Sequence, residues 1–140
     1  MMTRKEFMFS ATALAAAGSC QGVNVGVPTR GIHVRFLGSG AAGWKPEWVA
    51  TKPHMRRQSS VLLENRVLID FTMCAFDKLP EGCRPEALFQ THSHGDHYNP
   101  KAAVKVGVKR MYVQETWAAA AREEIAAAAQ ELNLPAPEVI

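Results

Sequence analysis

Long apolar runs, a framework of cysteines and a strong excess of charge are all missing from this sequence of 140 residues. No stretch reaches the roughly 18 consecutive apolar residues of a membrane-spanning helix, so no ordinary membrane span is expected. The 16 Lys and Arg residues against 13 Asp and Glu residues give a net charge of only +3. That excess is too small to predict nucleic acid as a partner, which would call for a clustered basic patch.

Cysteine is scarce, with 3 residues in the whole chain, and none of them has a metal-type spacing such as Cys-x-x-Cys. Cys74 and Cys83 lie on either side of a loop that contains proline and glycine. In an oxidising compartment they can pair, and otherwise they are free, partly buried thiols. The cysteines therefore leave both alternatives open.

Histidine is also scarce, yet 3 of the 5 histidines fall in one short segment, as His92, His94 and His97, together with Asp96. Imidazole nitrogens and carboxylate oxygens are ligands of divalent metals, and one loop can direct several of them to one point. In an extended loop His92 and His94 point to the same side, because side-chain direction repeats every two residues. The segment therefore predicts a metal site.

The order His-x-His-x-Asp-His resembles the signature loop of the metallo-β-lactamase superfamily. The flanks are similar too, because two short apolar strands within residues 61–70 and a strand over residues 87–91 precede the loop. The similarity runs over residues 32–140. Residues 36–40 and 57–60 most resemble the branch that holds the tRNA 3′-processing endonuclease and the cyclic-phosphate phosphodiesterases.

This resemblance implies an α/β protein of the αββα metallo-β-lactamase fold, of which the chain supplies about the first half. It implies two ions, one held by His92 and His94 and one by Asp96 and His97, with Asp96 as the catalytic carboxylate. Zn²⁺ suits these ligands first, and Mn²⁺ or Fe²⁺ is the alternative. The implied activity is a metal-dependent hydrolase whose ions activate a hydroxide against a phosphodiester or another ester-like substrate. Hydrolysis of a lactone or a β-lactam is the alternative within the same fold.

Three further residues are candidates for roles around the metal. Asp70, at the end of an apolar strand, either accepts an imidazole N–H and orients a ligand or is simply a turn residue. Arg57 either clamps a phosphate or belongs to a solvated surface pair with its neighbour. Tyr98 either lines a substrate pocket or covers the loop.

No histidine and no aspartate follow His97. A complete site of the resembling family takes a histidine, a bridging aspartate and another histidine from its second half. We therefore expect residues 31–140 to be the N-terminal part of a longer domain. Two alternatives remain, a non-catalytic fragment and a metal-binding or redox relative that performs no hydrolysis.

The first 20 residues have the pattern of an export signal. Arg4 and Lys5 form a basic start, residues 7–17 are apolar, and small residues follow. The start is similar to a twin-arginine motif with Lys5 in place of the second arginine, and Cys20 stands where a lipoprotein signal carries its lipidated cysteine. We predict an exported protein, periplasmic or held at a membrane by lipid on Cys20, with residues 21–30 as a linker. The alternative is an alanine-rich N-terminal helix of a cytoplasmic protein.

The remaining pattern predicts alternating strands and helices. Residues 31–37 alternate apolar and polar, which is typical of a half-buried strand. A short helix at 101–106 and a strand at 109–113 follow the histidine loop. A helix at 116–132, capped by Thr116, carries one apolar face.

A second motif fails on its context. Gly38, Gly40 and Gly43 fit the Gly-x-Gly-x-x-Gly pattern of dinucleotide-binding folds. That pattern needs a helix that begins at the glycines, and Pro46 and Pro53 interrupt such a helix. We therefore expect a loop there and no bound nucleotide.

Overall fold

A computed structural model describes residues 31–140, except residues 41–42, 44, 46–47, 53 and 55. The chain divides into a first unit, residues 1–30, and a second unit, residues 31–140. The predicted export signal, the linker and lipidation of Cys20 all lie outside the described residues and remain predictions. No helix within the described part is long and apolar enough to cross a membrane.

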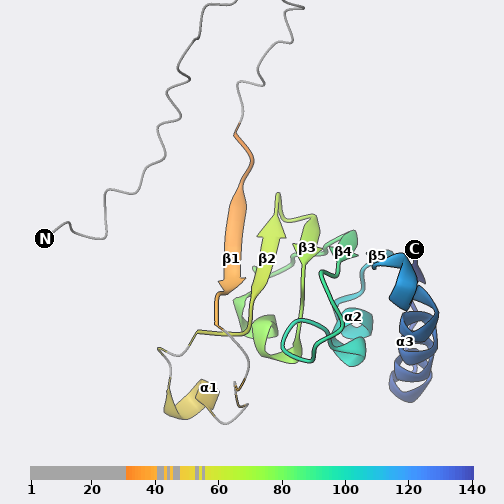
Figure 1. Cartoon of the computed structure of the whole chain (residues 1–140). Coiled ribbons are helices and arrows are strands. Elements are labelled where there is room, and N and C mark those ends of the chain that lie inside the picture. The colour runs from red at the N-terminus through yellow and green to blue at the C-terminus, as the bar shows by residue number, and fades with distance from the viewer. Residues whose placement is uncertain (1–30, 41–42, 44, 46–47, 53, 55) are drawn as a thin grey trace, which may run out of the picture. The chain divides into compact units, whose positions relative to one another are not determined.

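The second unit is built on one mixed sheet whose strands follow chain order, β1-β2-β3-β4-β5-β6. β1 to β3 are antiparallel neighbours, whereas β3 to β6 run parallel to one another. The alternation of strands and helices is visible in Figure 1. The α/β class predicted from the sequence is confirmed. The strands are β1 (Val34–Gly38), β2 (Ser60–Leu63), β3 (Val67–Ile69), β4 (Ala87–Phe89), β5 (Arg110–Tyr112) and β6 (Glu138–Val139).

One face of the sheet forms the core together with α2 (Pro100–Val106) and α3 (Ala118–Leu132). Leu62, Leu68, Leu88 and Met111 occupy successive strands of this face and have no exposed surface. Small residues on both helices, with Ile125 of α3, join the same hydrophobic cluster. Alanine allows close approach of helix to sheet, and α3 ends at Asn133 in a left-handed conformation, φ 51°.

The opposite face of the sheet is also apolar, but it is exposed. Val34 and Phe36 of β1 and Phe89 of β4 are 46%, 73% and 44% exposed. The Phe89 ring stacks on the Tyr112 ring with centroids 4.5 Å apart. Pairing across the strands places all four residues on the side away from Leu88 and Met111.

Three local features of the structure add to or correct the sequence pattern. The turn between β2 and β3 lies at Glu64 and Asn65, both with positive φ. Thr116 does not cap α3. A 3₁₀ turn, η2 (Glu115–Trp117), precedes the helix, and Trp117 is the N-cap residue of α3. A 3₁₀ helix that the pattern did not predict, η1 (Met73–Lys78), follows β3.

Two glycines, at the end of β1 and just after it, have a structural explanation. The Gly40 N–H donates to the Arg57 carbonyl over 2.7 Å. A Cβ atom at Gly38 would lie 2.0 Å from the Gln58 carbonyl oxygen, and one at Gly40 would lie 2.9 Å from that of Arg57. Both glycines therefore permit close approach of two backbone segments. The next described helix, α1 (Trp48–Thr51), begins well after them.

Candidate metal centre

The histidine loop leaves the carboxyl end of β4, next to the carboxyl end of β3. Ile69 and Phe89 pair in parallel as the last residues of the two strands. Asp70 and Gln90 therefore follow side by side, and the Asp70 N–H donates to the Phe89 carbonyl over 2.9 Å. Clefts at the carboxyl ends of parallel strands are where open α/β sheets bind ligands.

Asp70 is held in an unusual backbone conformation. Its φ is 50°, a left-handed value that only a few residue types other than glycine tolerate. The Ser60 hydroxyl donates to its carbonyl oxygen over 2.7 Å, and the Asp70 residue is 5% exposed. This conformation turns the carboxylate out of the strand and toward the loop.

The Asp70 carboxylate accepts hydrogen bonds from three residues of the β4 end and the loop. Gln90 Nε2 and the Thr91 N–H donate to Oδ1 over 2.9 and 2.8 Å. The Thr91 hydroxyl lies 2.8 Å from Oδ2, and His97 Nδ1 lies 2.7 Å from the same oxygen. This is the contact that an orienting role for Asp70 requires, and it distinguishes Asp70 from an ordinary turn residue.

The loop gathers His92, Asp96 and His97 into one group. One donor atom from each lies within 4.8 Å of the other two, and all three residues are partly buried. The His92 and His97 ring centroids are 4.1 Å apart. The loop closes through N–H groups of His97 and Tyr98 that donate to the His94 carbonyl over 2.9 and 2.8 Å.

This grouping differs from the expected pairing of His92 with His94 and of Asp96 with His97. His92 joins the second pair, while His94 is exposed and its ring meets the His92 ring edge-on, 4.8 Å between centroids. Among the described residues this is the one group of three metal-type donors. The geometry therefore favours a single first ion at His92, Asp96 and His97, with His94 beside it.

One distance within the group matches the spacing of ligand atoms around a divalent ion. Ligand atoms about 2.1 Å from a tetrahedral zinc ion lie about 3.4 Å apart. His97 Nε2 and Asp96 Oδ2 are 3.6 Å apart, close to that separation. Two imidazoles and one carboxylate are also a common donor set of catalytic zinc, which leaves one position open for water or substrate.

Arg57 is neither solvated nor free to clamp a phosphate. Its side chain is 3% exposed, and its Nη2 and Nε atoms donate to the Asp77 carboxylate over 2.8 and 3.3 Å. The hydrogen bond that Arg57 donates to Asp77 raises the pKa of Arg57 against the opposing effect of burial. Both alternatives expected for Arg57 are therefore replaced by a structural ion pair with η1.

Tyr98 is buried behind the loop. It is 5% exposed, and its ring packs edge-on against Trp117 with centroids 4.6 Å apart. Burial raises the pKa of Tyr98, and the carboxylate of Glu124 raises it further. Its hydroxyl oxygen has no well-formed hydrogen bond within the described part of the chain. The structure therefore favours the covering role over the pocket-lining role.

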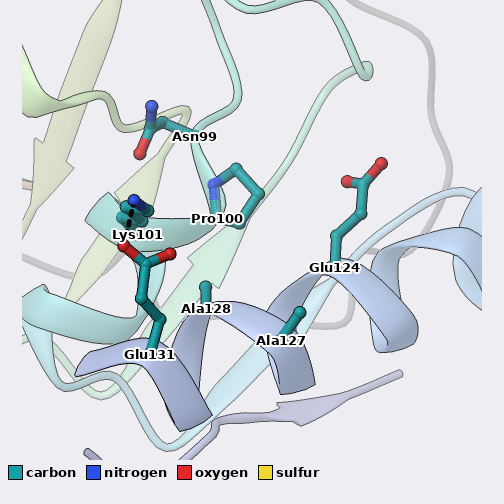
Figure 2. A pocket seen from close by; sticks show the side chains of 7 residues that line it. All are labelled: Asn99, Pro100, Lys101, Glu124, Ala127, Ala128 and Glu131. Atoms are coloured by element: carbon teal, nitrogen blue, oxygen red, sulfur yellow. Dashed lines mark hydrogen bonds and ion pairs between the residues drawn. The ribbon is translucent and has the colours of Figure 1, made fainter. Parts of the chain in front are cut away.

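A pocket of about 340 Å³ lies between the start of α2 and one side of α3. Figure 2 shows Lys101 next to Glu131 at one end of it, with Glu124 at the other. Asn99 lies at the rim of the pocket and caps α2, because the Oδ1 atom of Asn99 accepts the Ala102 N–H over 2.9 Å. None of the metal-type donors of the loop lines this pocket, so it is separate from the candidate metal centre.

The two described cysteines are both free. Cys74 is buried, with its sulfur 3.1 Å from the Thr72 hydroxyl, and Cys83 is partly buried. Of the alternatives that the sequence left open, the structure contains the free thiols.

Two residues of this network, Gln90 and Thr91, were not predicted as site residues from the sequence. Gln90 Nε2 also donates to the His92 carbonyl over 3.1 Å, and the Thr91 hydroxyl lies 2.9 Å from His92 Nδ1. The signal that could have revealed them is their place between a strand end and the first ligand, opposite an aspartate at the end of the neighbouring strand.

Comparisons of the chain with protein-family models, with curated proteins and with solved structures found no match.

Proposed function

We propose that this chain carries the metal centre of a metal-dependent hydrolase of the metallo-β-lactamase type. The observation that carries the proposal is the group of His92, Asp96 and His97, with donor atoms within 4.8 Å of one another at the end of a parallel strand. The Asp70 carboxylate behind His97 adds support, because metal-bound imidazoles usually donate their second N–H to such a group.

Each residue of the centre has a distinct task. His92 and His97 supply neutral nitrogen donors, and Asp96 supplies a charged oxygen that offsets part of the charge of the ion. These residues would hold a divalent ion, Zn²⁺ first, and the chemistry supplied there would be a lowered pKa of a water molecule and polarisation of the bond to be cleaved. Asp70 holds the His97 ring in place, so that its Nε2 faces Asp96 Oδ2 at 3.6 Å. The carboxylate of Asp96, which is partly exposed, could also accept a proton from an attacking water.

A phosphodiester is the substrate class that we propose first. The support for this substrate class is the sequence similarity of residues 36–40 and 57–60 to the phosphodiesterase branch. Arg57 adds no support as a phosphate-binding residue, because its guanidinium is paired with Asp77. Lactones and β-lactams are the alternative substrates of the same chemistry.

The proposal is tested by loading the protein with Zn²⁺ and measuring hydrolysis of a bis-aryl phosphodiester, a lactone and a β-lactam. We expect turnover of the phosphodiester that disappears on chelation and returns with metal. His97→Ala should abolish both bound metal and turnover. His33→Ala is the matched control, because His33 is exposed and makes its hydrogen bond to Glu64 through its backbone. Bound metal without turnover of any of the three substrates would overturn the hydrolase proposal.

The second candidate function is metal binding without hydrolysis. It is favoured by the number of close donors, three among the described residues, where a two-ion centre needs more. Two histidines and one carboxylate also suit ferrous iron with open positions. Equal retention of Fe²⁺ and Zn²⁺ with no hydrolysis in either form would support this candidate.

A further inference from the structure

We propose that Thr91 is a positioning residue of the metal centre, whose hydroxyl fixes the tautomer and the direction of the His92 ring. The inference rests on the proposed function, because the His92 ring that Thr91 orients is a donor of the same proposed metal centre. It adds a residue that is not itself a ligand.

The Thr91 hydroxyl lies between an acceptor and an imidazole. Its oxygen is 2.8 Å from Asp70 Oδ2, 3.0 Å from Oδ1 and 2.9 Å from His92 Nδ1. A hydroxyl has one proton to donate, whereas an ionised carboxylate can only accept. The proton of Thr91 therefore goes to Asp70, and toward His92 the Thr91 oxygen is an acceptor.

This assignment sets the proton of the His92 ring. Nδ1 must carry the hydrogen that it donates to Thr91, so Nε2 keeps the lone pair with which a neutral imidazole binds metal. At His97 the same result follows directly, because its Nδ1 donates to Asp70 Oδ2 over 2.7 Å. One carboxylate thus orders both rings, His97 by contact and His92 through Thr91.

The surroundings of Asp70 make this network hard to rearrange. Its Oδ1 already accepts from Gln90 Nε2 and from the Thr91 backbone N–H, and Asp70 and Gln90 are 5% and 6% exposed. Gln90 Nε2 also donates to the His92 carbonyl, which holds the backbone of the residue whose ring Thr91 orients. Ring and backbone of His92 are therefore fixed by neighbouring side chains of the β4 end.

The first test needs no variant. Long-range ¹⁵N–¹H NMR of the metal-free protein at about pH 8, where an imidazole of ordinary pKa is neutral, reports the tautomer of each histidine. We expect the Nδ1–H form for both His92 and His97. A predominant Nε2–H form at His92 would overturn the proposal, whatever the outcome of mutagenesis.

The second test compares Thr91→Val with Thr91→Ser, using Zn²⁺ alone as the probe. The valine variant keeps the shape and the backbone N–H but loses the hydroxyl. We expect its Zn²⁺ affinity to fall about 10-fold, with a mixed tautomer at His92 and an unchanged one at His97. The serine variant should behave like the wild type, and Thr116→Val, at an exposed threonine in η2, is the control.

Unchanged affinity and an unchanged His92 tautomer in Thr91→Val would overturn the proposal. If the valine variant fails to fold, the wild-type tautomer and the serine variant still decide. These measurements do not depend on turnover. A protein that shows the expected tautomers and the fall in affinity but hydrolyses nothing would reject the proposed hydrolase and retain the role of Thr91.

Discussion

The Nδ1 atom of His97 lies 2.7 Å from Oδ2 of Asp70, although the two residues are 27 positions apart in the chain. The contact exists because β3 and β4 are parallel neighbours that end at the same level. Asp70 then takes a left-handed backbone conformation that brings its carboxylate under the loop. The ring of His97 is therefore contacted by the residue that directly follows the neighbouring strand, β3.

Replacing that carboxylate should weaken metal binding without removing a ligand. In Asp70→Asn the acceptor becomes a neutral amide that holds the His97 N–H less strongly. We expect Zn²⁺ affinity to fall roughly 10- to 100-fold, as measured by competition with a chromophoric chelator. Glu123→Gln, which removes an exposed carboxylate on α3, is the control. Affinity equal to the wild type in Asp70→Asn would assign Asp70 to the turn alone.

The four loop donors should differ in importance. His92 belongs to the group within 4.8 Å, whereas the exposed His94 lies beside it. Binding of the first Zn²⁺ should therefore be lost in His92→Ala and only reduced in His94→Ala. Isothermal titration of both variants gives the ranking. Equal losses would indicate that metal binding rearranges the loop into the pairs expected from the sequence.

Much of this arrangement could be predicted from local sequence. The apolar segments of β2, β3 and β4 follow from the hydrophobic pattern. The start of α2 follows from Asn99 as the N-cap residue and from Pro100 as the first helical residue. The Asp70 contact could be proposed but not decided, because it depends on the parallel register of two strands. The shared group of His92 with Asp96 and His97 was not predicted, because the alternation rule holds for an extended loop and this loop turns at His94.

The burial of the Arg57 charge could not be predicted from the sequence either. Arg57 resembles any surface arginine in sequence, and only the position of η1 supplies Asp77 as its partner. Propensity does not report such pairs, because they form between residues that are close only after folding.

Gly38 should be essential for stability for a steric reason. A Cβ atom there would lie 2.0 Å from the Gln58 carbonyl oxygen, which is backbone and cannot rotate away. We expect Gly38→Ala to lower the free energy of unfolding by about 3 kcal/mol or more. Gly31→Ala, where a Cβ atom meets nothing within 4 Å, should have little effect. Urea denaturation measures both, and equal stability of the two variants would contradict this explanation.

Tyr98→Phe should leave the protein as stable as the wild type or slightly more stable. The change removes a buried hydroxyl that has no well-formed partner in the described part of the chain, while the ring keeps its contact with Trp117. The expected gain is up to about 1 kcal/mol in the free energy of unfolding, because a desolvated polar group is removed. A loss of comparable size would reveal a hydrogen bond at this hydroxyl, with Glu124 as the first candidate.

The Arg57–Asp77 pair should make stability depend on pH in the acid range. Burial alone would raise the pKa of Asp77, but hydrogen bonds and charge from Arg57 and Lys78 outweigh it and lower the pKa below its ordinary 3.8. A carboxyl group whose pKa is lower in the folded than in the unfolded state stabilises the fold above its ordinary pKa. That contribution is lost as the pH falls through the lower, folded value.

Asp77→Asn removes this contribution and leaves the guanidinium with a weaker acceptor. Because Asp77 is 39% exposed, solvent screening limits the difference at neutral pH to about 1 kcal/mol. Urea denaturation between pH 7 and the acid range should show the wild type more stable at neutral pH, with the two proteins converging below the ordinary pKa of aspartate. Glu123→Gln should show no such convergence. A wild-type advantage that stays constant into that acid range would mean that the pair does not lower the pKa of Asp77.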